Sequence, residues 1–147
     1  MNIVSSIALA VAFILLGVNR IINIKKNTEA LYEAVRFISS VKNNIRYLSM
    51  DYVSLVENAV NENYSYITFY PEITISDCVG EKVKVEFLQF VQKIGTTDED
   101  GQLNFCDEYI ERFKGFYNES ASKEKSKVNV IGAISVLCVM CALVLGG

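Results

Sequence analysis

The 147-residue sequence contains no histidine, no tryptophan and a single proline. Histidine is the commonest general base and the commonest metal ligand, so its absence disfavours many enzyme classes and many metal sites. No glycine-rich run precedes a Lys-Ser or Lys-Thr pair, so the phosphate-binding loop of many ATPases is also missing. We therefore expect a protein that is not an enzyme and that needs no cofactor, metal or small-molecule substrate.

Charge is missing from both ends of the chain. The 14 basic and 17 acidic side chains all lie between Arg20 and Lys127, and the flanking residues are mostly apolar. A helix that crosses a bilayer core of about 30 Å needs roughly 20 apolar residues, which both ends supply. The sequence predicts transmembrane helices over residues 1–24 and 128–147.

Basic residues flank both predicted spans on the side that faces the middle of the chain. Arg20, Lys25 and Lys26 lie at the end of the first span, and Lys123, Lys125 and Lys127 precede the second. Lysine and arginine close to a span resist translocation and stay on the cytoplasmic side of the membrane. These residues predict a cytoplasmic domain over residues 25–127, with both termini outside.

A cleaved signal peptide is the main alternative for the first apolar run, whose length suits a secretory hydrophobic region. In a signal peptide, positive charge precedes the apolar run, whereas here Arg20, Lys25 and Lys26 follow it. No A-x-A-like cleavage site follows the run. An uncleaved membrane anchor is therefore the preferred interpretation.

Hydrophobic spacing predicts an all-α helical bundle for the domain between the spans. Along a helix over residues 28–48, the apolar stripe comprises Leu31, Ala34, Val35, Ile38, Val41, Ile45 and Leu48. The opposite face carries Glu29, Glu33, Arg36, Lys42 and Arg46. A second helix over residues 51–63 is capped by Asp51 and buries Tyr52, Val53, Val56, Ala59 and Val60.

The rest of the domain is predicted as an extended loop and two further helices. Residues 64–79 are rich in aromatic and β-branched side chains, but no second strand is found to pair with them, so we expect a loop packed on the helices. A helix over residues 80–94 buries Val83, Phe87, Phe90, Val91 and Ile94, and Gly95 stops it. The last helix is capped by Thr97 or Asp98, and its inward stripe comprises Leu103, Cys106, Ile110, Phe113, Tyr117 and Ser120.

The domain body is acidic, with 8 basic and 16 acidic residues over residues 27–119. This balance makes nucleic acid an improbable partner. The basic rims suit anionic lipid headgroups. The acidic body suits a basic partner surface, or it simply keeps the domain in solution.

The segment over residues 94–102 carries a recognisable pattern. Gly95, Asp98 and Gln102 occupy the places of a leucine-glycine-x-x-aspartate-x-x-x-glutamine motif, with Ile94 in place of the leucine. An amphipathic helix, a lysine-rich join and a terminal apolar span follow it. In these features, and in its N-terminal anchor and first long helix, the chain resembles the stage III sporulation protein AB family, although its middle is shorter.

The resemblance implies a role in a membrane channel complex that spore-forming bacteria build between mother cell and forespore. The family's domain is similar to the cytoplasmic domains of platform proteins in type II secretion and type IV pilus machines. The implied partners are the cytoplasmic ATPase of the complex, which is the AA protein of the same series, and the other channel subunits. The implied function is a non-enzymatic platform or scaffold subunit whose domain faces the mother-cell cytoplasm.

Other patterns in the sequence have simpler interpretations. Cys138 and Cys141 form a C-x-x-C pair, but they lie within a predicted span, where cysteine behaves as a small apolar residue. The acidic run over residues 98–100 lacks the ligand spacing of a calcium loop and suits a helix start. The alternative function is a small oligomeric pore or holin-like membrane protein, although Ser5, Ser6 and Ser135 offer few polar groups to line a water path.

Overall fold

The computed structural model describes residues 3–48 and 52–146. In chain order the elements are α1 (Ile3–Leu48), α2 (Tyr52–Asn61), β1 (Ile67–Thr68), β2 (Thr74–Ile75), α3 (Glu81–Lys93) and α4 (Glu99–Gly146). Most described residues are helical, which confirms the predicted all-α class. The two longest helices each include one predicted terminal span together with part of the predicted domain.

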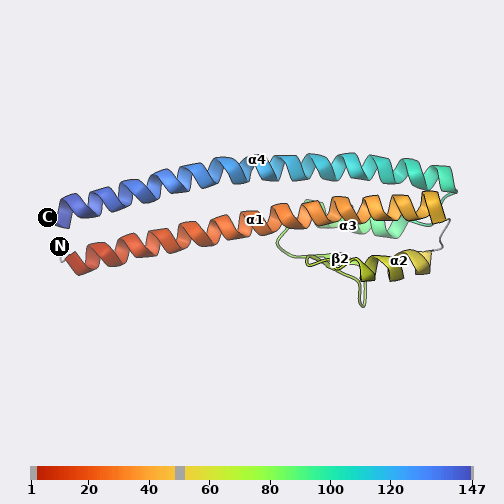
Figure 1. Cartoon of the computed structure of the whole chain (residues 1–147), viewed down its shortest axis with the longest axis horizontal. Helices are drawn as coiled ribbons and strands as arrows, with labels where there is room; N and C mark the ends of the chain where they lie inside the picture. The colour runs from red at the N-terminus through yellow and green to blue at the C-terminus, as the bar shows by residue number, and fades with distance from the viewer. Residues whose placement is uncertain (1–2, 49–51, 147) are drawn as a thin grey trace.

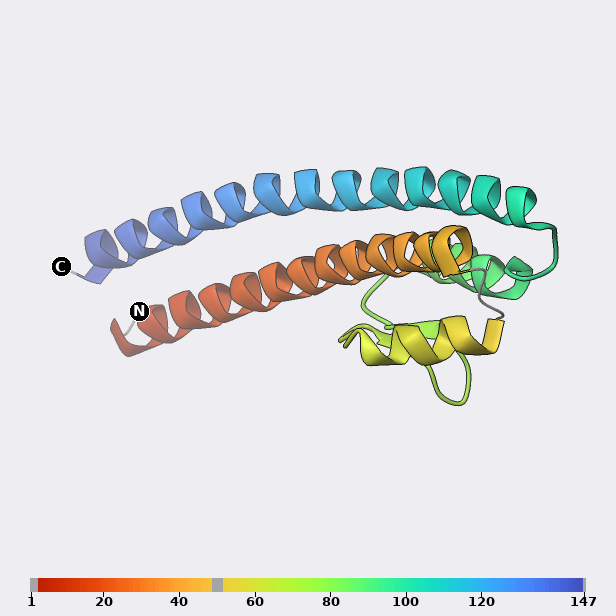
Figure 2. The same cartoon turned by 45° about the vertical axis from the view of Figure 1, so that its right-hand side comes forward.

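Helices α1 and α4 lie antiparallel along the whole molecule, so the two chain ends lie together (Figure 1). The smaller elements pack on α1 and α4 only at the end away from the termini (Figure 2). Contacts along the pair keep one register, from Lys42–Asp107 through Tyr32–Tyr117 and Thr28–Ser120 to Gly17–Ile131. Both helices continue without a break through the lysine-rich joins.

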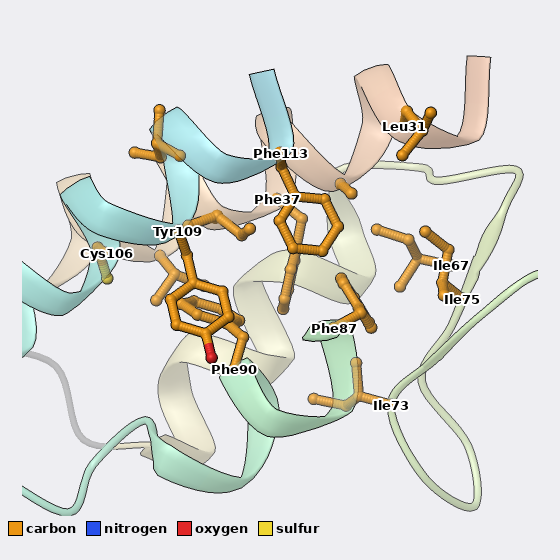
Figure 3. Close-up of a cluster of buried hydrophobic side chains, with 14 of the residues drawn as sticks. Leu31, Phe37, Ile67, Ile73, Ile75, Phe87, Phe90, Cys106, Tyr109 and Phe113 are labelled. Atoms are coloured by element: carbon orange, nitrogen blue, oxygen red, sulfur yellow. The ribbon is translucent and has the colours of Figure 1, made fainter. Parts of the chain in front are cut away.

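Aromatic side chains dominate the core between α1, α3 and α4 (Figure 3). Phe37 of α1 is 3% exposed, and its ring centroid lies 5.7 Å from that of Phe87 and 6.3 Å from that of Phe90. The Phe37 ring also contacts Tyr64 and Phe69, with centroid distances of 6.0 and 5.8 Å. Edge-to-face and tilted contacts of this kind add to the stabilisation that burial alone gives.

Most of the predicted inward residues are buried or half-buried. On α1 the buried members are Leu31, Ala34, Ile38, Val41 and Ile45, and Val35 is half-buried. On α3 and α4 they are Phe87, Phe90, Cys106, Ile110, Phe113 and Ser120, and the half-buried ones are Val83, Val91, Ile94, Leu103 and Tyr117.

The prediction for the second helix was partly wrong. Helix α2 buries Ala59 but leaves Val60 53% exposed. It ends at Asn61, and Asn63 adopts a left-handed backbone with φ of 57°. Since this conformation breaks helical geometry, the helix cannot reach the predicted end at residue 63. The Asp51 cap and the side chains of Leu48, Tyr52, Val53 and Val56 lie outside the described residues.

The loop predicted over residues 64–79 contains a β-hairpin, and that prediction is corrected here. Strand β1 pairs with β2 in antiparallel register, Ile67 opposite Ile75 and Thr68 opposite Thr74. The segment was treated as one strand without a partner, but the chain reverses around Pro71 and supplies both strands itself. Ile67 and Ile75 are both buried, so the hairpin covers the core with one face.

Candidate functional site

The charge-free ends of α1 and α4 expose large apolar side chains on their outer surfaces. On α1 these are Ile7, Val11, Phe13, Leu15, Leu16 and Val18, and on α4 they are Val128, Val130, Ile134, Val136, Leu137 and Met140. Within residues 3–48 and 52–146, no helix is both long and apolar enough to cross a membrane.

The inner surfaces of the same ends pack against each other. A β-carbon on Gly17 would lie only 2.9 Å from Cγ2 of Ile131. Glycine therefore lets α1 and α4 come closer here than a residue with a side chain would allow. Beside this contact lies a groove of about 240 Å³, lined mainly by apolar residues together with Arg20, Ser135 and Cys138. The Ser135 hydroxyl donates to the carbonyl of Ile131 at 2.9 Å, which satisfies it within its own helix.

The antiparallel register brings the two basic rims to one level of the helix pair. The rim on α1 comprises Arg20, Lys25 and Lys26, the rim on α4 comprises Lys123, Lys125 and Lys127, and all six side chains are exposed. Lys25 pairs with Glu29 at 3.8 Å and Lys123 with Glu119 at 2.5 Å. The hydrogen bond from Lys123 lowers the pKa of Glu119, which keeps that carboxylate charged. The rims therefore form one cationic belt between the apolar ends and the domain.

A chain of polar hydrogen bonds crosses the helix pair just inside this belt. The Asn27 amide donates to the Ser120 hydroxyl at 2.9 Å, and the Thr28 and Ser120 hydroxyl oxygens lie 2.9 Å apart. Because the Thr28 hydroxyl donates to the carbonyl of Ile24 at 3.1 Å, Ser120 must donate to Thr28. Thr28 and Ser120 are both only 7% exposed. These hydrogen bonds therefore satisfy buried hydroxyl groups that would destabilise the fold if they had no partner.

The family-motif residues build the turn between α3 and α4. Gly95 has φ of 81°, a conformation that favours glycine, and α3 ends just before it. Asp98 Oδ1 accepts a hydrogen bond from the backbone N–H of Gly101 at 3.1 Å, so Asp98 rather than Thr97 caps α4. The Gln102 side-chain amide donates to the carbonyl of Thr97 at 2.7 Å. This bond joins the first turn of α4 to the loop that precedes it.

The polar face of α1 binds the loop that leads into the hairpin. The Glu33 carboxylate accepts the backbone N–H groups of Ser65 and Tyr66, the latter at 2.7 Å. The Tyr66 hydroxyl donates to Glu29 at 2.8 Å, and this bond, with burial, raises the pKa of Tyr66 to about 12. Glu29 and Glu33 were predicted to lie on an outward face, because the loop that supplies their partners comes more than 30 residues later in the chain.

Arg36 lies on the same face and holds the end of α2. Its guanidinium donates to the carbonyls of Glu62 and Asn63 at 3.2 Å each, and its Cζ lies 4.3 Å from the centroid of the Tyr64 ring. Burial is the main cause that raises the pKa of Tyr64, followed by the hydrogen bond to Glu62. Carbonyl and ring contacts of a cation together fix the left-handed turn at Asn63.

Ion pairs on the surface of the domain link α4 to α3 and to α1. Arg112 of α4 bonds to Glu86 of α3 and to Glu108 at 2.5 Å each, and Lys42 of α1 pairs with Asp107. The side chains over residues 98–100 remain exposed at the turn. That turn lies at the end of the molecule opposite the termini (Figure 1).

Among the described residues, no group of three histidine, cysteine, aspartate or glutamate side chains could hold a metal ion. Burial raises the pKa of the Cys106 thiol to about 12, which suppresses its thiolate near neutral pH. Cys138 is half-buried in the groove between the apolar ends, Cys141 is exposed, and both thiols are free.

Comparison with known proteins adds no family assignment. The chain matches no family model, no curated protein and no solved structure.

Proposed function

We propose that this protein is a non-enzymatic platform subunit, anchored in the membrane by its two apolar ends, whose domain over residues 25–127 docks a cytoplasmic partner. One observation carries the proposal. Helices α1 and α4 run unbroken from the domain, through the cationic belt, into paired ends that are free of charge and expose apolar side chains. Such ends suit lipid, and the belt suits the cytoplasmic headgroup layer.

The resemblance to the stage III sporulation protein AB family makes the proposal specific. The complex would be the secretion-like channel needed for endospore formation, and the partner would be its cytoplasmic ATPase. The domain would face the mother-cell cytoplasm. The turn between α3 and α4, with its exposed acidic side chains, would point away from the membrane toward that partner.

The continuous helices suggest how such a subunit works. A force applied to the domain would pass along α1 and α4 rather than being absorbed by a linker. The hydrogen bonds among Asn27, Thr28 and Ser120 would keep the two helices in register at the membrane surface. The partner would supply the energy, and this chain would transmit it.

Membrane insertion is tested first, with the full chain expressed in a bacterium. The chain should resist alkaline extraction from membranes. Protease should digest the domain in inverted vesicles and leave it intact in right-side-out vesicles. Release by alkali would refute the anchor, and digestion in right-side-out vesicles would refute the orientation.

Partner docking is tested next, by co-elution of the detergent-purified full chain with the sporulation ATPase. Retention should fall in a Glu99→Gln/Asp100→Asn variant and persist in Glu72→Gln, which removes an exposed carboxylate elsewhere. An inserted chain that never retains the ATPase would refute the docking role. If its overexpression also made cells leak ions, the pore alternative would replace it.

A further inference from the structure

A second groove opens between α1 and α4 where α3 begins, beside the cationic belt. It has a volume of about 240 Å³, and its lining is both polar and apolar. The polar residues are Asn27, Glu119, Ser120, Lys123 and Lys127, and the apolar residues include Ile24, Leu31, Val83 and Phe116. Gly80, directly before α3, also lines the groove.

Cationic groups outnumber anionic groups around this groove. Lys123 bonds to Glu119, the carboxylate of the lining. Lys127 takes part in no ion pair with any residue that the structure describes. Lys82 adds a third cation, since its Nζ lies 5.5 Å from the centroid of the Phe116 ring. Glu81, the carboxylate at the start of α3, is 3.8 Å from Lys84 and is thereby partly neutralised.

The position of the groove suits a ligand with one charged and one apolar part. Lys127 stands at the boundary of the charge-free end of α4, and Ile24 stands one turn of α1 beyond Arg20. A ligand that bonds to the lysines would therefore sit at the proposed membrane surface. Its apolar part would pass Ile24, which lies at the level of Lys123, and continue toward the lipid-facing ends.

We infer that this groove binds the headgroup of an anionic phospholipid, whose phosphate lies between Lys123 and Lys127 and whose first chain carbons contact Ile24 before they enter the lipid. The inference rests on the proposed function, because it requires the belt to lie at a membrane surface. It deepens that function by adding a defined lipid to the anchor. The bound lipid would join α1, α3 and α4 at the level where the domain meets the membrane.

Gly80 allows a test that separates binding from folding. Its φ is −67°, and a β-carbon there would meet nothing within 4 Å, so a side chain fits without strain. Gly80 precedes α3 and provides no side-chain cap, so Gly80→Asp and Gly80→Ser should each supply one. Only the aspartate also places a negative charge in the lining of the groove. The serine variant is the matched control.

The experiment measures retention of phosphatidylglycerol, against phosphatidylcholine, by the full chain in mild detergent, using native mass spectrometry. Lys127→Gln should weaken phosphatidylglycerol binding about fivefold, and Lys123→Gln/Lys127→Gln roughly thirtyfold. Gly80→Asp should weaken it while thermal stability is unchanged or raised. Gly80→Ser should bind as the wild type does. Lys125→Gln, which removes an exposed lysine outside the groove lining, should change binding less than twofold.

Two outcomes would overturn the inference. One is equal weakening by Lys125→Gln and Lys127→Gln, which would mean a diffuse attraction to the whole belt. The other is retention of phosphatidylglycerol by Gly80→Asp at the wild-type level. Alkaline extraction of the same variants distinguishes the two proposals, because an inserted chain without lipid preference refutes only the groove, whereas an extractable chain refutes the anchor.

Discussion

Gly17 of α1 lies so close to Ile131 of α4 that a β-carbon on the glycine would come within 2.9 Å of the isoleucine Cγ2. Gly17→Ala should therefore push the apolar ends apart and lower the stability of the full chain in detergent by about 1–2 kcal/mol. Thermal unfolding followed by circular dichroism measures this. Adding Ile131→Ala should restore part of the loss, because it removes the methyl group that clashes.

Gly132 provides the control for this substitution. It lies on the same helix as Ile131, but a β-carbon there would meet nothing within 4 Å. Gly132→Ala should be neutral or stabilising by up to about 1 kcal/mol, because alanine is the better helix former. If Gly17→Ala behaved like Gly132→Ala, the ends of α1 and α4 would not be in contact.

The buried hydroxyl of Ser120 should contribute strongly to the stability of the fold, although the side chain is small. Ser120→Ala removes the acceptor for Asn27 and the donor to Thr28, so we expect a loss of about 1–3 kcal/mol in the free energy of unfolding. A Thr28→Val/Ser120→Ala pair should lose less than the sum of the single variants, because the groups that bond to each other leave together. Ser122→Ala, on the exposed side of the same helix, should stay within about 0.5 kcal/mol of wild type.

The helical part of the fold was predictable because its signals are local. Spacing of three and four residues identifies the inward stripes, and Gly95 and Asp98 mark the end of one helix and the start of the next. Phe37 was missed for a physical reason. A prediction of one apolar stripe holds for a helix that packs against one partner. Helix α1 packs against α4 on one side and against the hairpin and α3 on another, so its buried surface is wider than one stripe.

The tertiary use of polar residues could not be predicted in the same way. Glu33 and Arg36 have the spacing of an ordinary outward face, and nothing local shows that a loop some 30 residues later supplies backbone groups to them. The groove beside Lys123 and Lys127 likewise exists only because α3 begins against α1 and α4. The two cationic rims could be predicted from the positions of lysine and arginine in the sequence. That they lie at one level follows only from the antiparallel register of α1 and α4.

The motif residues of the α3–α4 turn should affect stability before they affect any partner. Asp98→Ala should cost about 1 kcal/mol through the lost helix cap, whereas Asp98→Asn, which also caps helices, should cost much less. Gln102→Ala should cost about 0.5–1.5 kcal/mol through the lost bond to Thr97. Denaturant unfolding of the full chain in detergent measures these differences. A stable Gln102→Ala variant that loses the ATPase would instead assign this side chain to the partner contact.

Cys106 should make the protein sensitive to alkali in a defined pH range. Its side chain is 0% exposed, and burial raises the thiol pKa from its ordinary 9.0 to about 12. The folded chain therefore keeps a proton that the unfolded chain releases above about pH 9. The resulting stability is fully present below pH 9 and is lost as pH rises from there toward 12, by up to about 1.4 kcal/mol per pH unit.

Thermal unfolding of wild type and Cys106→Ala at pH 8 and pH 10 tests this sign and size. The alanine variant should be less stable at pH 8, because a buried side chain has been shortened. Between pH 8 and pH 10, however, wild type should lose about 1 kcal/mol more than the variant, because only wild type has this thiol to ionise on unfolding. Tyr64, Tyr66 and Tyr109 also have raised pKa values, but both proteins contain them, so their contribution cancels. Equal losses in the two proteins would mean that Cys106 already ionises in the folded state, in conflict with its burial between α1 and α4.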